Sequence, residues 1–143
     1  MIRLIGVVAL LLAGAAGGTA GTAPPASPAS DDEVAKGRTL YAQCSACHSP
    51  AYHRTGPKHC NLNGRKAGSA PGFDYTEAMK NAGIVWGPQS LDRFLQDPLG
   101  TVPGTSMTVA GLKDPAQRAA LVQYLLSLDA HHADCNGQAD TGD

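Results

Sequence analysis

The sequence predicts an all-α fold in which small helices are joined by long loops. Residues 31–44 and 115–128 each repeat apolar side chains at the three- and four-residue spacing of a helix. Each segment also begins with a helix-start signal, which is a run of acidic residues in the first and an Asp-Pro pair in the second. Many of the chain's 17 Gly and 10 Pro residues lie between the two segments, which indicates extensive loops there.

The first helix is expected to pack one face against another helix. Val34, Gly37, Tyr41 and Cys44 recur at spacings of three, four and three, and therefore share a face. The acidic residues 31–33 stand where the dipole of a helix N-terminus favours them. Glycine in the middle of a helix costs about 1 kcal/mol relative to alanine. A close helix crossing at this position would explain the glycine.

The second helix is expected to begin at a clear cap. Asp114 is placed at the N-cap, Pro115 at the first helical position and Gln117 at the third. The apolar stripe of this helix consists of Leu121, Tyr124, Leu125 and Leu128.

Two shorter helices are expected between the long ones, and the rest of the chain is expected to be loop. Residues 76–82 form the first, which Gly83 closes as a C-terminal glycine. Residues 88–96 form the second, which stops before Pro98 because proline disfavours helical geometry in the residue before it.

The N-terminal residues have the features of an export signal. Residues 1–3 carry one positive charge, residues 4–16 are almost purely apolar, and residues 18–20 offer a small-residue cleavage site. The segment is short for a membrane span of about 20 residues, and an uncleaved membrane tether is the alternative. We therefore expect export to the oxidising periplasm. The predicted organisation is a signal peptide (1–20), a Pro/Ala/Ser-rich linker (21–30), a folded domain (31–135) and a flexible C-terminal tail (136–143).

Composition limits the classes of partner and of core. A formal net charge of −1 gives neither a basic excess for nucleic acid binding nor an acidic tail. The chain has only one Trp, four Tyr and two Phe, which is few for a core of this size. A bulky apolar cofactor would supply the missing volume, and long loops could wrap around it.

The central motif is Cys-Ser-Ala-Cys-His at residues 44–48, the C-x-x-C-H pattern of covalent c-type haem attachment. Three residues apart on a helix, Cys44 and Cys47 share a face, so both sulfurs can reach the two vinyl groups on one haem edge. His48 follows directly and can supply the proximal iron ligand.

Two other interpretations of this motif are a thioredoxin-like redox pair and half of a zinc site. A redox pair would need a preceding strand and a βαβ pattern, and neither is present. Zinc remains open by composition, because His53, His59 and Cys60 lie nearby in the sequence. The export signal and the methionine motif described next weigh against zinc.

Residues 103–107, Pro-Gly-Thr-Ser-Met, make the pattern specific when they are combined with the upstream C-x-x-C-H. Together the two motifs resemble the class I cytochrome c family, of the mitochondrial and bacterial soluble type with a single haem. The resemblance covers about residues 33–128 and includes Gly56-Pro57, Gly64-Arg65, Gly72-Phe73, Tyr75 and Ile84-Val85-Trp86. It implies the cytochrome c fold, in which small helices and long loops wrap one covalently bound haem c. It also implies that the terminal helices cross at right angles, with Gly37 at the contact.

The resemblance implies roles for individual residues. Met107 would be the distal iron ligand, and the carbonyl of Pro57 would accept a hydrogen bond from the non-ligating nitrogen of His48. A buried haem propionate needs donors, and the residues implied near the propionates are Arg65, Tyr75, Trp86 and Thr105.

Other side chains compete for the axial positions. Met107 could instead be an ordinary core residue, and Met79 is a second methionine in an expected helix. His53 and His59 could in principle ligate iron. His53, however, is too close in sequence to His48 to reach the opposite face of a haem easily.

The chain departs from the mitochondrial pattern in several places. Phe94 stands where those proteins have a Tyr near the axial methionine, which predicts a shifted reduction potential without fixing the sign. Ser106 replaces a common Lys beside the haem edge, and residues 58–61 are unlike the usual sequence. With only five Lys and six Arg, docking should depend less on salt than in lysine-rich relatives.

Cys60 and Cys135 remain once the haem has taken its pair. Two leftover cysteines in an exported protein suggest a disulfide. Closing a loop of this length would stabilise the domain by about 4 kcal/mol in the chain-entropy model. Two free thiols, or a metal site with His59, His131 and His132, are the alternatives.

The implied function is electron transfer without catalysis. Ligation by His48 and Met107 would fill both axial positions, so the iron would cycle between Fe(II) and Fe(III) with no vacant site for a substrate. The carrier would be a monomer that docks transiently on redox partner proteins through the exposed haem edge. It would meet membranes only through those partners. An open-site haem peroxidase would require Met107 to be absent or labile. Family members that bind gases as four-helix bundles carry C-x-x-C-H near the C-terminus, whereas here it opens the domain, and a structural zinc protein would contain no haem.

Overall fold

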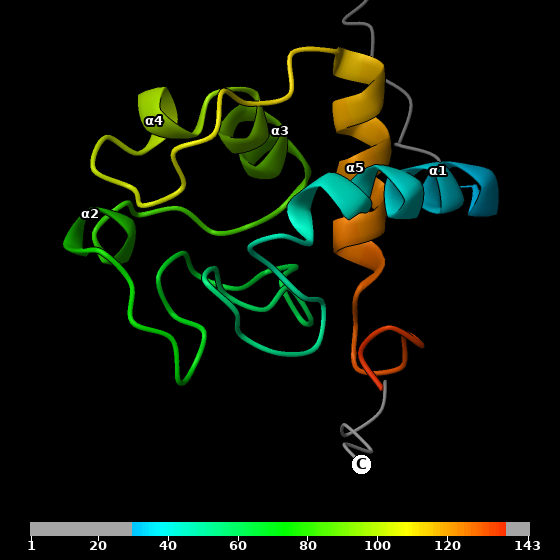
Figure 1. Cartoon of the computed structure of the whole chain (residues 1–143), viewed down its shortest axis with the longest axis horizontal. Coiled ribbons are helices and arrows are strands. Elements are labelled where there is room, and N and C mark those ends of the chain that lie inside the picture. The colour runs from blue at the N-terminus through cyan, green and yellow to red at the C-terminus, as the bar shows by residue number, and fades with distance from the viewer. Residues whose placement is uncertain (1–29, 137–143) are drawn as a thin grey trace, which may run out of the picture.

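The computed structural model describes residues 30–136. The predicted signal peptide (1–20), linker residues 21–29 and tail residues 137–143 lie outside the described part. In chain order the helices are α1 (Asp31–Tyr41), the 3₁₀ turn η1 (Ala42–Cys44), α2 (Glu77–Lys80), α3 (Pro88–Gln96), α4 (Pro98–Thr101) and α5 (Pro115–Ser127). Long loops join them (Figure 1). Over residues 30–136, β structure is limited to one isolated bridge, and no helix has the length and apolar character of a membrane span.

Helices α1 and α5 cross and form the main helix pair of the fold (Figure 1). The crossing lies at the buried Gly37, where an added Cβ would overlap the carbonyl oxygen of Ala120 and the Cβ of Tyr124. Only a residue without a side chain lets the two backbones approach this closely. The close crossing expected at Gly37 is therefore confirmed.

Helix α5 begins at the predicted cap. The carboxylate of Asp114 accepts hydrogen bonds from the backbone N–H groups of Ala116, at 2.8 Å, and Gln117, at 3.0 Å. Pro115 occupies the first helical position, where its missing N–H leaves no hydrogen bond unmade. The predicted stripe is buried, with at most 4% of any member exposed: Leu121, Tyr124, Leu125 and Leu128. This stripe packs in the centre of the core.

The shorter helices differ from the expectation in one place. Helix α3 has the predicted bounds, and α2 lies within the predicted segment with Thr76 as its N-cap. The expectation of loop after Gln96 is wrong, because α4 starts at Pro98. The carboxylate of Asp97 accepts a hydrogen bond from the N–H of Gly100 at 3.0 Å, and Pro98 fits the first helical position. The proline that ends one helix thus begins the next.

A buried arginine ties α5 to α3. Arg118 is only 6% exposed, and its Nε donates to Oδ1 of Asp92 at 2.7 Å. Its Nη1 donates to the carbonyl oxygens of Leu112, at 3.0 Å, and Lys113, at 3.1 Å. One guanidinium therefore satisfies an acid on α3 and two carbonyls of the loop that leads into α5.

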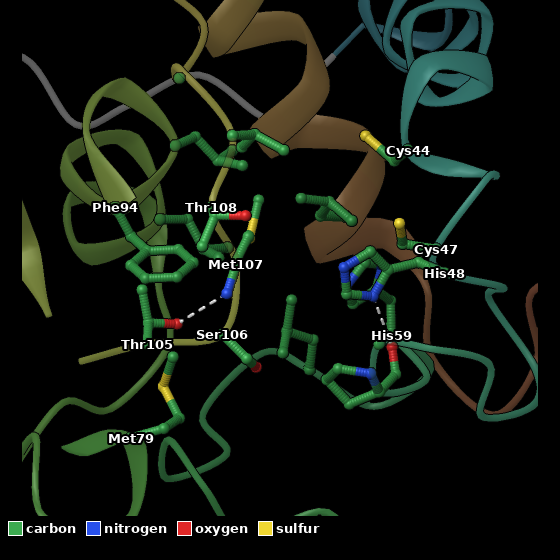
Figure 2. Close-up of a pocket in the computed structure, with 18 of the residues that line it drawn as sticks. Cys44, Cys47, His48, His59, Met79, Phe94, Thr105, Ser106, Met107 and Thr108 are labelled. Atoms are coloured by element: carbon green, nitrogen blue, oxygen red, sulfur yellow. Dashed lines mark hydrogen bonds between the residues drawn. The ribbon is translucent and has the colours of Figure 1, made fainter. Parts of the chain in front are cut away.

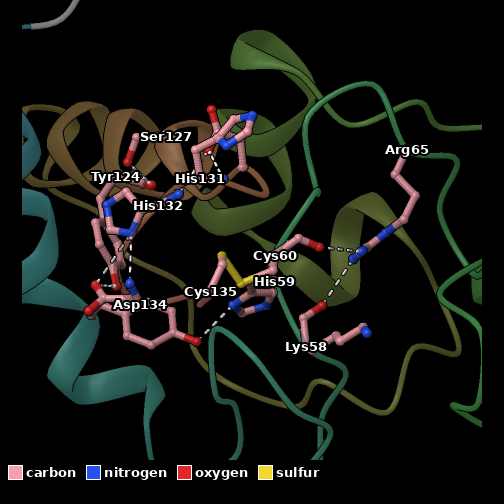
Figure 3. Close-up of a disulfide and its surroundings, with 12 residues drawn as sticks. Lys58, His59, Cys60, Arg65, Tyr124, Ser127, His131, His132, Asp134 and Cys135 are labelled. Atoms are coloured by element: carbon pink, nitrogen blue, oxygen red, sulfur yellow. Dashed lines mark hydrogen bonds and ion pairs between the residues drawn. A yellow bond between two sulfur atoms is a disulfide. The ribbon is translucent and has the colours of Figure 1, made fainter. Parts of the chain in front are cut away.

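Past α5 the chain is fastened to the domain by a disulfide between Cys135 and Cys60, whose Cα atoms are 5.7 Å apart (Figure 3). The neighbouring Asp134 accepts hydrogen bonds from the hydroxyl of Tyr124, at 2.7 Å, and from the guanidinium of Arg38, at 2.6 Å. These contacts make the segment after α5, up to the disulfide, part of the folded domain. The structure joins Cys60 and Cys135 to each other, and among residues 30–136 no three His, Cys, Asp or Glu side chains converge on a metal position.

Candidate cofactor site

A largely apolar cavity of about 470 Å³ lies at the centre of the domain. One wall is formed by η1 and the residues after it, and the facing wall by the loop after α4 (Figure 2). Buried apolar side chains complete the lining, among them Leu62, Met79, Trp86, Leu91, Phe94 and Leu121. Protein interiors are close-packed, so a cavity of this size in so small a domain indicates a bulky apolar ligand.

The segment at η1 brings Cys44, Cys47 and His48 to one side of the cavity (Figure 2). The N–H groups of Cys47 and His48 donate to the carbonyl of Cys44, at 3.1 and 2.9 Å, so the helical turn continues past η1. The two sulfurs therefore share a side, as their spacing predicts. In the free thiol form, burial and then the nearby Cys47 raise the pKa of Cys44 to about 11.

His48 carries a nitrogen that is free to bind iron. Its Nδ1 lies 2.8 Å from the carbonyl oxygen of Pro57. A carbonyl can only accept, so Nδ1 carries the proton and Nε2 keeps its lone pair. Burial lowers the pKa of His48, although the hydrogen bond to Pro57 opposes this, and the neutral ring is favoured. Gly56 makes room for the ring, because an added Cβ there would overlap the imidazole.

Met107 faces His48 from across the cavity (Figure 2). Its loop is fixed by Thr105, whose buried hydroxyl oxygen accepts a hydrogen bond from the N–H of Met107 at 3.2 Å. Gly104, just before, has a φ of 93°, a left-handed conformation that glycine adopts readily. An imidazole and a thioether on opposite sides of a cavity are a known ligand pair for haem iron.

The two competing histidines have other partners. His53 uses both ring nitrogens, since Nε2 donates to the carbonyl of Pro71 at 2.9 Å and Nδ1 accepts from the N–H of Lys58 at 3.1 Å. His59 lines the cavity on the same side as His48, because the two rings stack with centroids 4.4 Å apart. Burial lowers the pKa of His59 well below its usual range, and His48 adds to the shift. Neither histidine lies opposite His48.

Met79 and Phe94 form an apolar end of the cavity beside Thr105 (Figure 2). Met79 is 8% exposed and Phe94 is 6% exposed, and the Phe94 ring lies 5.2 Å from that of Trp86. Figure 2 shows Met79 away from the space between His48 and Met107. The sequence identifies Met79 only as a competing axial ligand, and its place at the end of the cavity is not predicted because α2 has only four residues, too few for an apolar stripe to appear.

Of the four residues implied as propionate partners, three line the cavity and one does not. Tyr75, Trp86 and Thr105 line the cavity, whereas Arg65 is not among the lining residues. The guanidinium of Arg65 donates instead to the carbonyls of Cys60 and Lys58, both at 3.0 Å (Figure 3). A guanidinium has five N–H donors, so Arg65 keeps further donors after these two hydrogen bonds. Arg65 thus fixes the loop after Pro57, and its propionate role remains a prediction.

The cavity residues fit a covalently bound haem c. Two sulfurs on one helical turn can form the thioether links, and an imidazole and a thioether can take the two axial positions. The remaining walls are mostly apolar, as a macrocycle requires. The described residues thus fit the attachment points, the axial ligands and the apolar surroundings that a haem c needs.

Comparison with known proteins agrees with this geometry. The sequence model of the family "Cytochrome c" matches residues 34–129. The chain belongs to the cytochrome c family. Cytochrome c2 of Afifella marina is 48% identical over 104 residues, covering 68% of this chain and 84% of that protein. Cytochrome c2 of Rhodomicrobium vannielii is 43% identical over 96 residues, covering 65% and 77%.

A solved structure supports the same conclusion. Cytochrome cH from Methylobacterium extorquens superposes with a TM-score of 0.63 at 35% identity, over 64% of this chain and 95% of that one. The predicted cytochrome c fold is therefore confirmed. This cytochrome c carries one covalently bound haem c and is an electron carrier that works with redox partners, not an enzyme. The zinc and peroxidase alternatives are set aside.

Proposed function

We propose that this cytochrome c is a monomer that carries single electrons between exported redox proteins, with His48 and Met107 as axial ligands and Cys44 and Cys47 as attachment points. The observation that supports this most directly is the facing pair, a neutral imidazole with a free Nε2 lone pair and a thioether across the cavity. When bound, haem c supplies the one-electron Fe(II)/Fe(III) couple.

The protein's part is to hold this ligand set rigid and dry. The carbonyl of Pro57 fixes one edge of the His48 ring, and Thr105 fixes the backbone of Met107. Apolar walls exclude water from the space between them. Ligands that move little between two oxidation states keep the barrier to electron transfer low. We also propose that Arg65, Tyr75, Trp86 and Thr105 stabilise the haem propionates.

The ligand assignment is tested by replacing each methionine of the cavity. Met107→Ala is expected to abolish the weak red-edge Met–Fe(III) absorption band and to lower the reduction potential by on the order of 0.1 V, within the roughly 0.8 V range that axial ligands command. Met79→Leu, the matched control, should change neither. If Met79→Leu removes the band and Met107→Ala keeps it, the assignment is wrong.

We propose a periplasmic location, with residues 1–20 as a cleaved signal peptide. Two observations support it: the apolar N-terminal segment, and the Cys60–Cys135 disulfide, which is typical of oxidising compartments. Expression of the full chain in a bacterium, followed by fractionation and intact mass measurement, tests it. We expect periplasmic protein that lacks residues 1–20. Full-length protein in the membrane fraction would instead support a retained tether.

We propose that partners dock where the cavity opens, beside the exposed Cys47 and the exposed segment 108–110. The chain has only five Lys and six Arg, which supports docking with little electrostatic steering. The rate of electron exchange with a purified redox partner should change less than about threefold between low and high salt, whereas steering gives tenfold or more. A steep salt dependence would contradict this mode of docking.

A further inference from the structure

His59 is a partly buried ring that lines the cavity, and the haem-binding residues do not explain its presence. It stacks on His48, with the ring centroids 4.4 Å apart and the ring planes 24° apart. A hydrogen bond of 2.9 Å joins its Nδ1 to the hydroxyl of Tyr41, and the two rings meet edge to face. His59 therefore contacts the proposed proximal ligand on one side and a residue of α1 on the other.

The backbone around His59 is held firmly. The N–H of His59 donates to the carbonyl of Pro50 at 3.1 Å, and the N–H of Cys60 donates to the same oxygen at 2.8 Å. The disulfide from Cys60 to Cys135 then fastens this loop to the segment after α5 (Figure 3). With its backbone and its Nδ1 both fixed, the His59 ring is a rigid surface against His48.

A neighbour of this kind controls rotation of the His48 ring about its Cβ–Cγ bond. The hydrogen bond to Pro57 fixes the Nδ1 edge of the ring, but the ring can still tilt about this hydrogen bond. The backbone at Gly56 approaches the ring so closely that a Cβ there would overlap it. His59 supplies the flat contact over the ring.

We propose that His59 is a positioning residue, anchored by Tyr41, that fixes the plane of the proximal imidazole. This inference rests on the proposed ligand role of His48. An aliphatic residue of similar size would fill the space, but it would offer neither a flat face to His48 nor a hydrogen-bond partner to Tyr41.

Three variants of the haem-loaded protein test the inference. His59→Leu removes both the flat face and the hydrogen bond, His59→Phe keeps the face, and Tyr41→Phe removes only the hydroxyl. The control is His131→Leu, because His131 is exposed and is not among the cavity residues. The readouts are the g-values of the oxidised low-spin iron and the paramagnetic NMR shifts of the His48 ring protons, both of which depend on the ligand plane.

We expect His59→Leu to shift the g-values and the His48 proton resonances, and to broaden both. Tyr41→Phe and His59→Phe should cause smaller shifts in the same direction, and His131→Leu should cause none. Parent-like g-values and proton shifts in both His59→Leu and Tyr41→Phe would overturn the inference, since Pro57 and Gly56 would then suffice. If His59→Leu takes up no haem, Tyr41→Phe decides alone. Failure of the proposed function would look different, because the parent itself would lack iron-shifted His48 resonances.

Discussion

Gly37 of α1 lies directly against the carbonyl oxygen of Ala120 in α5, with no space between them for a side chain. This contact sets how closely the two terminal helices approach. The end of α1 leads into η1 and the attachment cysteines, and Leu121 and Leu125 of α5 line the cavity. The crossing therefore sets the position of the haem-attachment turn relative to the cavity wall.

The first prediction concerns this crossing. Gly37→Ala should lower the free energy of unfolding by about 1–3 kcal/mol, because the new Cβ would overlap backbone that cannot rotate away. The gain of about 1 kcal/mol in helix propensity is too small to offset the overlap. Denaturant unfolding followed by circular dichroism measures the change. Gly87→Ser is the control, since nothing lies near a Cβ there and Ser suits an N-cap. A stabilised Gly37→Ala variant would contradict the close contact.

The second prediction concerns the buried Arg118. Arg118→Met should cost about 1–3 kcal/mol, because Asp92 and two loop carbonyls lose their donor, while water can still reach the partly exposed Asp92 carboxylate. Arg118→Lys should recover part of the loss, since one ammonium cannot reach all three oxygens. The exposed Arg93 gives the control Arg93→Met, which should change the unfolding free energy by less than about 0.5 kcal/mol. Equal effects at both positions would show that the Arg118 contacts add nothing.

The third prediction concerns the disulfide. The bond between Cys60 and Cys135 spans 75 residues, and closing a loop of that length contributes about 4 kcal/mol in the chain-entropy model. Replacing both cysteines by Ala should lower the unfolding free energy by about that amount. A reductant should destabilise the parent but not the double variant. Thiol titration of the unfolded, haem-loaded parent should find no free thiol, and a count of two would refute the bond.

The fourth prediction is a loss of stability in alkali through Tyr124. Burial, followed by the hydrogen bond to Asp134, raises the pKa of Tyr124 well above its ordinary value. A raised folded-state pKa stabilises the protein below the unfolded pKa of about 10, and this contribution is lost as the pH rises above it. The stability difference between the parent and Tyr124→Phe should therefore shrink above pH 10, by up to about 1.4 kcal/mol per pH unit. Tyr52→Phe, at an exposed tyrosine, should show a constant difference; the same constancy for Tyr124→Phe would count against the assignment.

Much of the fold could be predicted from local signals. Asp114 and Pro115 mark the start of α5 because a cap and a first-turn proline act within a few residues of each other. Gly37 indicates the helix crossing because glycine destabilises a helix interior, and a close contact between helices explains its presence there. Helix α4 was not predicted, because Pro98 is equally consistent with the end of α3. The contact that distinguishes the two is the hydrogen bond from the N–H of Gly100 to the Asp97 carboxylate.

The site was predictable where its chemistry is covalent or ligating, and less so where it depends on packing. Cys44, Cys47 and His48 are adjacent in sequence, so their spacing alone brings them to one turn. The stack of His59 on His48, and the hydrogen bond of His59 to Tyr41 at the end of α1, bring together residues that are not neighbours in sequence, and nothing in their spacing indicates these contacts. The Lys-His-Cys sequence at residues 58–60 differs from the usual family sequence, but this difference does not indicate that His59 bonds to Tyr41 of α1.

The pairing of Cys60 with Cys135 has a consequence for biogenesis. In the export proposed above, the chain would emerge with Cys44, Cys47 and Cys60 well before Cys135, so these early thiols could form mispaired bonds with one another. Any of these would consume a sulfur that the cofactor requires. In an oxidising compartment, attachment of haem to Cys44 and Cys47 would then compete with premature disulfide formation. Overproduction in the presence of a strong thiol oxidant would therefore yield colourless protein without haem.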